Sequence, residues 1–191
     1  MYYVAHGSIP RQRHTQHRAA DGSLYAEELF GVEGFTGRSS LLYHLAPPTQ
    51  VHRIEEGPRI RLEAADDGLH RHRLTKTAGL PIAGDVVTGR VPLYFNHDVV
   101  FGIVRPSGPM PEGTFYRNGV ADELLFVHEG SGVCATNFGP LRYGPGDYLV
   151  LPIGTTWRLA DVCRRSWDSD VPELSFVGNA IERPHCYVGP R

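Results

Sequence analysis

The 191-residue chain lacks the features that mark several large classes of protein. No hydrophobic run approaches the roughly 20 residues that a membrane-spanning helix needs. The first residues contain no apolar stretch of secretory length. Lysine and arginine (19) nearly balance aspartate and glutamate (21), which gives a net charge of −2. The charge balance therefore indicates neither nucleic acid nor a membrane as a partner.

Cysteine is also scarce. The three cysteines, Cys134, Cys163 and Cys186, form no CxxC pair, which argues against a disulfide framework and against a zinc knuckle. A reducing compartment is therefore expected, with the cytoplasm as the default localisation. Cys134 lies in a strand-like segment with no paired histidine nearby in sequence, so a buried and inert thiol is favoured over a nucleophile.

No long segment shows the 3.6-residue period of a helix, so helix is expected to be scarce. Glycine (22) and proline (15) are frequent and separate short apolar or alternating segments. These segments are Asp98–Pro106, Asp122–Gly130, Ser131–Gly139, Gly146–Gly154 and Pro172–Gly178. Short strands at this spacing predict an all-β sandwich or barrel.

The pattern predicts a single domain over residues 1–191 with three parts. Residues 1–55 are expected to form an irregular arm with short strands, because they are rich in glycine, histidine and arginine and contain few periodic runs. Residues 56–90 are expected to form a variable region with a hairpin that turns at Asp67-Gly68. Residues 91–180 are expected to hold the barrel core.

Two spacings of carboxylate, proline and glycine stand out within the predicted barrel. Glu123 is followed after six residues by Gly130, and Gly146 is followed by Pro152 and Gly154. Both spacings are similar to parts of the two sequence signatures of cupins. In cupins the glycines permit turns, and strand alternation points metal ligands into the barrel mouth. The sequence therefore predicts a cupin-type double-stranded β-helix, a jelly-roll barrel, with little helix.

The histidines that hold a metal ion in cupins are missing from these positions. Tyr116 and Asn118 stand near the places of the first two histidines, and Trp157 stands at the place of the last. Glu123 alone cannot hold Fe(II) or Zn(II), since such sites need imidazole ligands as well. We therefore expect no metal ion at this site and no other cofactor bound to this chain. Glu123 is interpreted as a vestigial ligand position or as a hydrogen-bonding residue.

Histidines elsewhere in the chain favour structural roles. His70 and His72 would face the same side of a strand, but no carboxylate follows at ligand spacing, so an exposed hairpin face is expected. His14 and His17 lie among arginines and could bind an anion or a partner chain. A structural role in the arm is favoured for both.

Two further patterns resemble catalytic motifs only superficially. Glu27 and Glu28 are adjacent, so their side chains diverge on a strand or a helix and are not expected to act as an acid–base pair. Glycines at Gly31, Gly34 and Gly37 lack the following Lys-Ser/Thr of a phosphate-binding loop.

Two long blocks of the chain resemble the N-terminal half of the homogentisate 1,2-dioxygenases. The blocks run from His6 to Thr49 and from Pro92 to Leu159. The most specific stretches are IPRQRHTQ, DGSLYAEELFG, GFTGRSSLLYH, FYRNG, DELLFVHEG and GDYLVLPIGTTWR. The resemblance is weaker between Glu55 and Gly89 and after Asp161.

The resemblance implies a protein with two cupin barrels. In that family the C-terminal barrel binds Fe(II) and opens the ring of homogentisate with O2 in tyrosine and phenylalanine breakdown. The N-terminal barrel is metal-free and serves as scaffold and subunit contact in trimers and hexamers. This chain would then be the non-catalytic half. Its expected partners are the C-terminal cupin, further copies of itself and, in the whole enzyme, a small aromatic substrate. A fragment of a longer protein is expected.

A stand-alone binding module remains as an alternative function. A metal-free barrel with Tyr116 and Trp157 at its mouth could hold a small ligand or a partner protein. A reading frame that continues into a second barrel with clustered histidine and glutamate would exclude this alternative.

Overall fold

The computed structural model describes residues 16–34, 36–57, 62–65, 72–160, 174–178 and 186–188, the last two stretches as backbone only. The chain divides into two compact units, Met1–Ile54 and Glu55–Arg191. The boundary between them falls at the end of the predicted arm.

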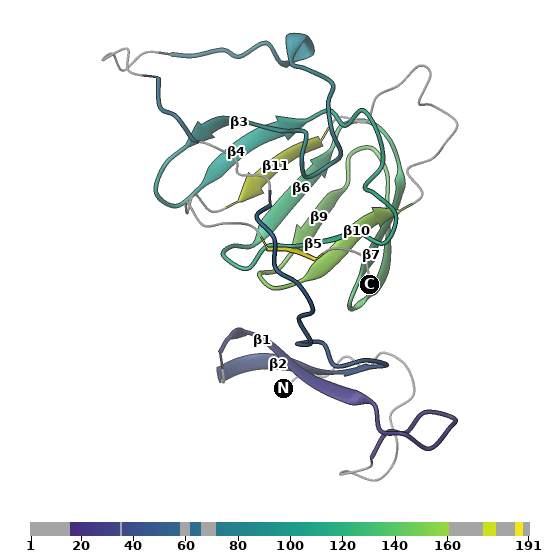
Figure 1. Ribbon diagram of the computed structural model, residues 1–191. Coiled ribbons are helices and arrows are strands. Elements are labelled where there is room, and N and C mark those ends of the chain that lie inside the picture. The colour runs from purple at the N-terminus through teal and green to yellow at the C-terminus, as the bar shows by residue number, and fades with distance from the viewer. Residues whose placement is uncertain are drawn as a thin grey trace. The chain divides into compact units, whose positions relative to one another are not determined.

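The first unit contains an antiparallel ribbon of two strands, β1 (Ala26–Glu33) and β2 (Thr36–His44) (Figure 1). Their register pairs Ala26 with His44 and shifts between Gly31 and Glu33. A short bridge between Arg18 and Leu24 precedes the ribbon. An isolated two-stranded ribbon is marginally stable in water, so the pairing of β1 with β2 contributes little stability by itself.

The second unit holds two five-stranded antiparallel sheets (Figure 1). Across the first sheet the order is β3 (Arg90–Phe95), β4 (Val100–Val104), β11 (Leu174–Gly178), β6 (Glu123–Val127) and β9 (Tyr148–Leu151). Across the second sheet it is β12 (Cys186–Val188), β5 (Phe115–Arg117), β10 (Thr156–Ala160), β7 (Gly132–Thr136) and β8 (Gly139–Tyr143).

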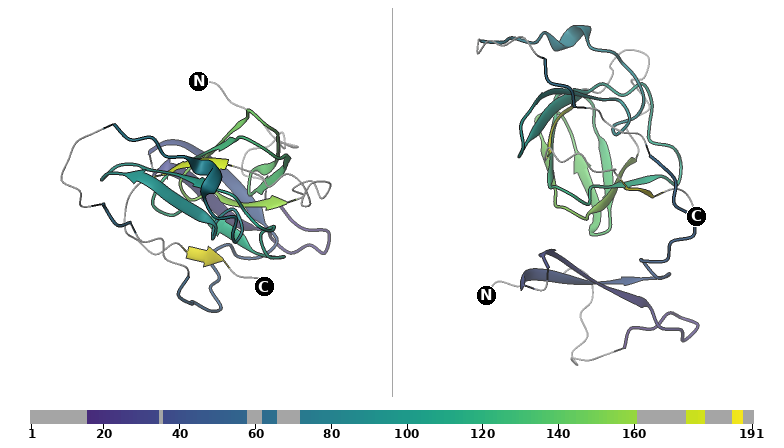
Figure 2. Two further views of the ribbon diagram at one scale, coloured as in Figure 1. Left: turned by 90° about the horizontal axis from the view of Figure 1, so that it is seen from above. Right: turned by 60° about the vertical axis from the view of Figure 1, so that its left-hand side comes forward.

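The order of strand pairing is that of a jelly roll. From β4 to β11 the strands pair from the outside inward, the first with the last, the second with the second-last and so on. The pairs are β4 with β11, β5 with β10, β6 with β9 and β7 with β8. A long hairpin wound in this way forms two facing sheets, which Figure 2 shows from two further directions. The prediction of an all-β, cupin-type jelly roll is thereby confirmed.

Helix is nearly absent, as predicted. Within the described stretches the only helical element is the 3-10 turn η1 (Thr77–Gly79). No helix in the described part of the chain is long and apolar enough to cross a membrane.

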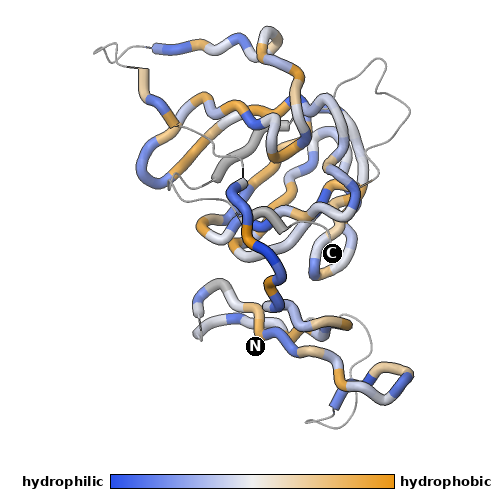
Figure 3. The backbone as a smooth tube through the Cα atoms, in the orientation of Figure 1, coloured by the Kyte–Doolittle hydropathy of each residue, from blue (hydrophilic) through white to orange (hydrophobic). Residues whose placement is uncertain are grey.

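The core lies between the two sheets and follows from strand alternation. On β6, Leu125 and Val127 are buried, whereas Leu124 and Phe126 are only partly covered. β4 is hydrophobic over most of its length (Figure 3), and all but one of its residues are buried, so both of its faces are largely covered. Each fully buried valine or leucine contributes about 1.5–3 kcal/mol to folding.

The signature glycines occupy turns that other residues resist. Gly130, Gly146 and Gly154 all have positive φ angles, of 89°, 90° and 80°, and L-residues with a Cβ rarely adopt this region. These turns return the chain between β6 and β7, between β8 and β9, and between β9 and β10. The glycine spacing therefore belongs to the turns of the barrel scaffold.

The predicted hairpin of residues 56–90 lies largely outside the described residues, including its turn at Asp67-Gly68. The described flanks 62–65 and 72–76 are not strands.

Candidate functional site

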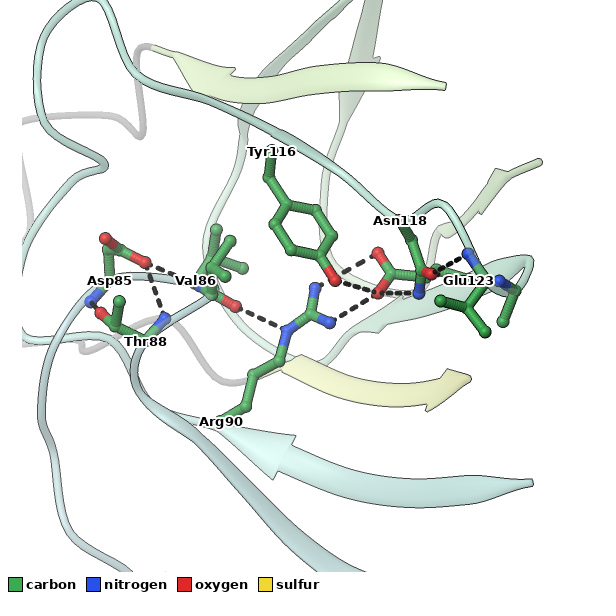
Figure 4. A network of polar contacts seen from close by, with 10 residues as sticks. Asp85, Val86, Thr88, Arg90, Tyr116, Asn118 and Glu123 are labelled. Atoms are coloured by element: carbon green, nitrogen blue, oxygen red, sulfur yellow. Dashed lines mark hydrogen bonds and ion pairs between the residues drawn. The ribbon is translucent and has the colours of Figure 1, made fainter. Parts of the chain in front are cut away.

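The signature positions meet at one place inside the barrel, and Figure 4 shows three of them, Tyr116, Asn118 and Glu123. Tyr116 lies on β5 and Asn118 follows it, Glu123 begins β6, and Trp157 lies on β10. Tyr116 and Trp157 are cross-strand partners. Their rings pack edge to face with centroids 5.4 Å apart. The sequence signatures thus identified residues that are neighbours in space.

Glu123 forms a buried ion pair with Arg90, the first residue of β3. The Arg90 Nη1 donates to Glu123 Oε1 at 2.6 Å, and Nη2 donates to Oε2 at 3.3 Å. Both side chains are 3% exposed. The Arg90 guanidinium also lies 5.1 Å from the ring centroid of Tyr116, within the range of a cation–π contact. Both carboxylate oxygens are therefore engaged by one fixed cation.

Two neutral donors complete the surroundings of Glu123. Its Oε1 accepts a hydrogen bond from Asn118 Nδ2 at 3.1 Å and another from the Tyr116 hydroxyl at 3.3 Å. Asn118 Oδ1 in turn accepts from the backbone N–H groups of Val120 and Ala121 at 2.9 and 3.0 Å. These two bonds orient the amide, because only the oxygen can accept them. Asn118, near one of the positions where a cupin has a histidine ligand, therefore donates a hydrogen bond to Glu123.

A tight loop before β3 holds the arginine in place. Asp85 Oδ1 accepts from the N–H groups of Val87 and Thr88 at 2.7 and 2.9 Å. The loop presents the Val86 carbonyl, which accepts from Arg90 Nε at 3.0 Å. A Cβ on Gly89 would lie 2.0 Å from the backbone oxygen of Ala83, so no side chain fits there. The loop thus depends on a glycine immediately before the arginine.

The charges of the pair stabilise one another against burial. Burial alone would raise the pKa of Glu123, but the charge of Arg90 and the hydrogen bonds from Arg90, Asn118 and Tyr116 outweigh it and hold the pKa below its usual value. Burial likewise opposes the charge of Arg90, yet attraction to Glu123 raises its pKa. Burial, and next the charge of Glu123, raises the pKa of Tyr116 far above its usual range. The site therefore contains an ionised pair and a neutral phenol.

The arrangement does not fit a divalent metal ion. A cupin-type Fe(II) site needs imidazole ligands around its glutamate, whereas Asn118, Tyr116 and Trp157 stand at or near the histidine positions. A guanidinium already contacts both oxygens of Glu123 and would repel a second cation. In the described part of the chain no three His, Cys, Asp or Glu residues are grouped to hold a metal. Glu123 thus has the hydrogen-bonding role that the sequence left open.

The aromatic mouth expected for a binding module is closed. Tyr116 and Trp157 are each 1% exposed and belong to the hydrophobic core. Their rings pack against each other and do not line an open pocket, so these two residues give no support to a ligand-binding module.

Of the histidines singled out in the sequence, the structure describes His17 and His72. His17 packs on the ring of Tyr43 with centroids 4.3 Å apart, in the first unit. His72 is exposed. His14 and His70 lie outside the described residues, so the proposed H-x-H face stays a prediction.

Glu27 and Glu28 diverge, as expected for adjacent strand residues. Glu28 bonds to His44 Nε2 at 2.7 Å, and Glu27 lies opposite Tyr43 in the register. Cys134 is buried in the core, and burial raises its pKa to about 12. Its thiol is therefore protonated at neutral pH and inaccessible, as expected for an inert cysteine.

Sequence reasoning missed Arg90. Its position, directly after a glycine and before the apolar run VPLYF, carries a weak signal. A charged residue that opens an otherwise apolar strand needs a buried partner. The partner could not be read from the sequence because Glu123 lies 33 residues away.

No family model matches the chain. A protein of Saccharolobus solfataricus named "Putative dioxygenase" is 37% identical over 190 residues, which are 98% of this chain and 47% of that protein. The chain therefore spans about half the length of the relative that it matches.

Solved structures with a similar backbone have low sequence identity. A variant of the Streptomyces protein PAC13 with uridine is 13% identical, with a TM-score of 0.43, over 63% of this chain and 93% of that chain. A cupin-2 domain protein from Shewanella frigidimarina is 15% identical, with a TM-score of 0.36, over 47% of this chain and 78% of that chain. Likenesses at this level carry no functional inference. The chain is a cupin-type jelly roll. Nearly its whole length is related to about half of a protein that is named as a dioxygenase.

Proposed function

We propose that this chain is the non-catalytic barrel of a ring-cleaving dioxygenase of the homogentisate type. The single observation that carries the proposal is the match of 98% of the chain to 47% of a protein named as a dioxygenase. That proportion leaves room in the relative for a second barrel, where we place the iron. The sequence resemblance to homogentisate dioxygenases supplies the substrate of the proposal. Its cytoplasmic setting follows from the cysteine pattern, which argues against a disulfide framework.

The Arg90–Glu123 pair supports a scaffold role for this barrel. Fe(II), when bound in the second barrel, would supply the binding of substrate and O2. In this barrel the carboxylate at the ligand position, Glu123, forms an ion pair that connects β3 with β6. Tyr116 on β5, and Asn118 just after it, donate hydrogen bonds to the same carboxylate on β6. These contacts fix the strands of both sheets around a closed centre. Such a barrel can offer a rigid surface to a catalytic partner.

A chimera tests the proposal most sharply. The matching half of the Saccharolobus relative is replaced by this chain, and O2 uptake is measured with homogentisate and with other dihydroxylated aromatic acids. We expect iron binding and homogentisate-dependent O2 uptake in the chimera. The chain by itself should show no O2 uptake.

Three outcomes separate the parts of the proposal. Uptake with a different aromatic acid would keep the scaffold role and refute the homogentisate assignment. A folded, iron-loaded chimera that is inactive with every aromatic acid, beside an active relative, would refute the scaffold role. Turnover by the isolated chain would refute its non-catalytic nature.

A further inference from the structure

One edge of the first sheet is formed by β9. This strand pairs with β6 on one side, and no strand that the structure describes pairs with its other side (Figure 1). The backbone groups on that open side therefore have no ladder partner in the described part of the barrel.

The hydrogen bonds at the start of β9 show which residues face the open edge. The Val127 N–H donates to the Asp147 carbonyl at 3.0 Å, and the Gly146 N–H donates to the Val127 carbonyl at 2.8 Å. Because backbone groups alternate in direction along a strand, Leu149, opposite Leu125, also directs its backbone toward β6. The N–H and C=O groups of Tyr148 and Val150 consequently point away from the sheet.

The side chains of β9 make this edge apolar. Leu149 and Leu151 are buried in the core, whereas Tyr148 and Val150 are each 63% exposed on the outer face. The Tyr148 ring lies 4.7 Å from that of Phe126, the neighbouring residue on β6. The strand YLVL contains no charge and no proline.

Two other edge strands of the barrel, β3 and β8, carry protection that β9 lacks. β3 contains Pro92 and a register shift between Pro92 and Tyr94. β8 contains Pro140 and an exposed Arg142. Prolines, irregular register and charges are the devices by which edge strands avoid pairing with other chains. An edge without them is suited to a partner strand.

We propose that β9 pairs antiparallel with β9 of a second copy of this chain, about a two-fold axis at Leu149. Tyr148 and Val150 then exchange N–H···O=C bonds with Val150 and Tyr148 of the partner subunit. A second copy fits this edge because Tyr148 and Val150, whose backbone groups point away from the sheet, lie on either side of Leu149, whose backbone groups point toward β6. A two-fold axis at that residue therefore matches every outward donor with an acceptor.

Side-chain packing supports the same register. Antiparallel partners lie on the same face of a sheet, so this pairing places Tyr148 beside Val150 of the partner subunit, an aromatic–β-branched pair. Leu149 meets Leu149 of the partner subunit on the core side. An isologous contact uses the same surface on both subunits, so each β9 edge is occupied by one partner. The assembly then contains an even number of copies and does not grow into a filament. The inference concerns the outer edge alone and does not depend on the proposed function.

The test measures the native mass of the full chain by light scattering over a range of concentrations. Val150→Pro removes the outward N–H without breaking a bond to β6, and Val150→Lys places a charge at the edge. Leu141→Lys, on the exposed side of β8, is the matched control. We expect an even-numbered assembly whose mass is halved by both Val150 variants and is unchanged in the control.

A thermal melt followed by circular dichroism accompanies each variant. If Val150→Pro fails to fold, Val150→Lys decides by itself, since its side chain points to solvent. A monomeric or odd-numbered wild-type chain would overturn the proposal. So would a folded Val150→Lys variant of unchanged mass, or wild-type assemblies that grow without limit.

Discussion

The two units of the molecule each contain a short contact between a carboxylate and a basic side chain, in different environments. Glu28 and His44 in the ribbon are 2.7 Å apart with side chains 20% and 27% exposed, whereas Arg90 and Glu123 in the barrel are 2.6 Å apart with side chains 3% exposed. Partly exposed pairs contribute little because water screens them. A buried pair adds modest net stability, but the loss of one partner leaves an isolated charge in the core. Burial, and not distance, therefore decides how much stability is lost when one partner of each pair is removed.

The largest expected effect follows from removing one half of the buried pair. Arg90→Ala leaves the Glu123 carboxylate without its cation, and we expect a loss of about 3–5 kcal/mol in the free energy of unfolding. Urea denaturation followed by tryptophan fluorescence would measure the loss. The double variant Arg90→Met with Glu123→Leu should recover much of it, because an apolar pair needs no compensation. A double variant as unstable as the single one would show that packing, and not charge, causes the loss.

Acid should act on the barrel through the same carboxylate. The folded-state pKa of Glu123 lies below its ordinary value of 4.5, so its contribution to stability is complete above that pH and is lost as the pH falls through the lower, folded-state pKa. We therefore expect the free energy of unfolding to fall below about pH 4.5. Glu123→Gln should be less stable at pH 7 and should show a weaker acid dependence. Parallel pH profiles for the two proteins would contradict this account.

A smaller effect is expected from one neutral donor of the site. Tyr116→Phe removes a hydroxyl that donates to Glu123 at 3.3 Å. The bond is long, so we expect a loss near the lower end of the range for charged acceptors, about 1.5 kcal/mol. Tyr148→Phe, at an exposed position, is the control and should leave the urea midpoint of the monomer unchanged. An equal loss in both variants would argue against a specific role for the Tyr116 hydroxyl.

The smallest effect is expected in the ribbon. His44→Ala removes the partner of Glu28, and we expect a change below about 1 kcal/mol because the pair is partly exposed. Hydrogen exchange of the β1 and β2 amides would report on this unit separately from the barrel. Loss of protection in the ribbon as large as that caused in the barrel by Arg90→Ala would remove the contrast between the two pairs.

Much of the barrel could be predicted from sequence because several of its strands are short apolar or alternating segments bounded by glycine and proline. β4, β6, β7 and β9 each lie within a predicted segment. β3 was not predicted, because it begins with Arg90 and contains Pro92, both unusual within a strand. β5 has only three residues, too few for a period to show.

The site was predictable only in part. The cupin-like spacing placed Glu123, Asn118 and Trp157 close together, because such spacings are fixed by strand lengths and turns. The pairing of Glu123 with Arg90 depends on which strands lie at the same end of the barrel, and no local pattern encodes it. Nor did the spacing show that Tyr116 and Trp157 are buried, since a strand residue can face the core or an open mouth equally well.

The central claim is that Arg90 engages Glu123 in place of a metal ion. Calorimetric titration of the folded wild-type chain and of Glu123→Gln with Fe(II), under argon, and with Zn(II) tests it most directly. The account predicts that neither protein binds an ion at this position with one-to-one stoichiometry. One ion bound tightly per wild-type chain, and lost in Glu123→Gln, would contradict it.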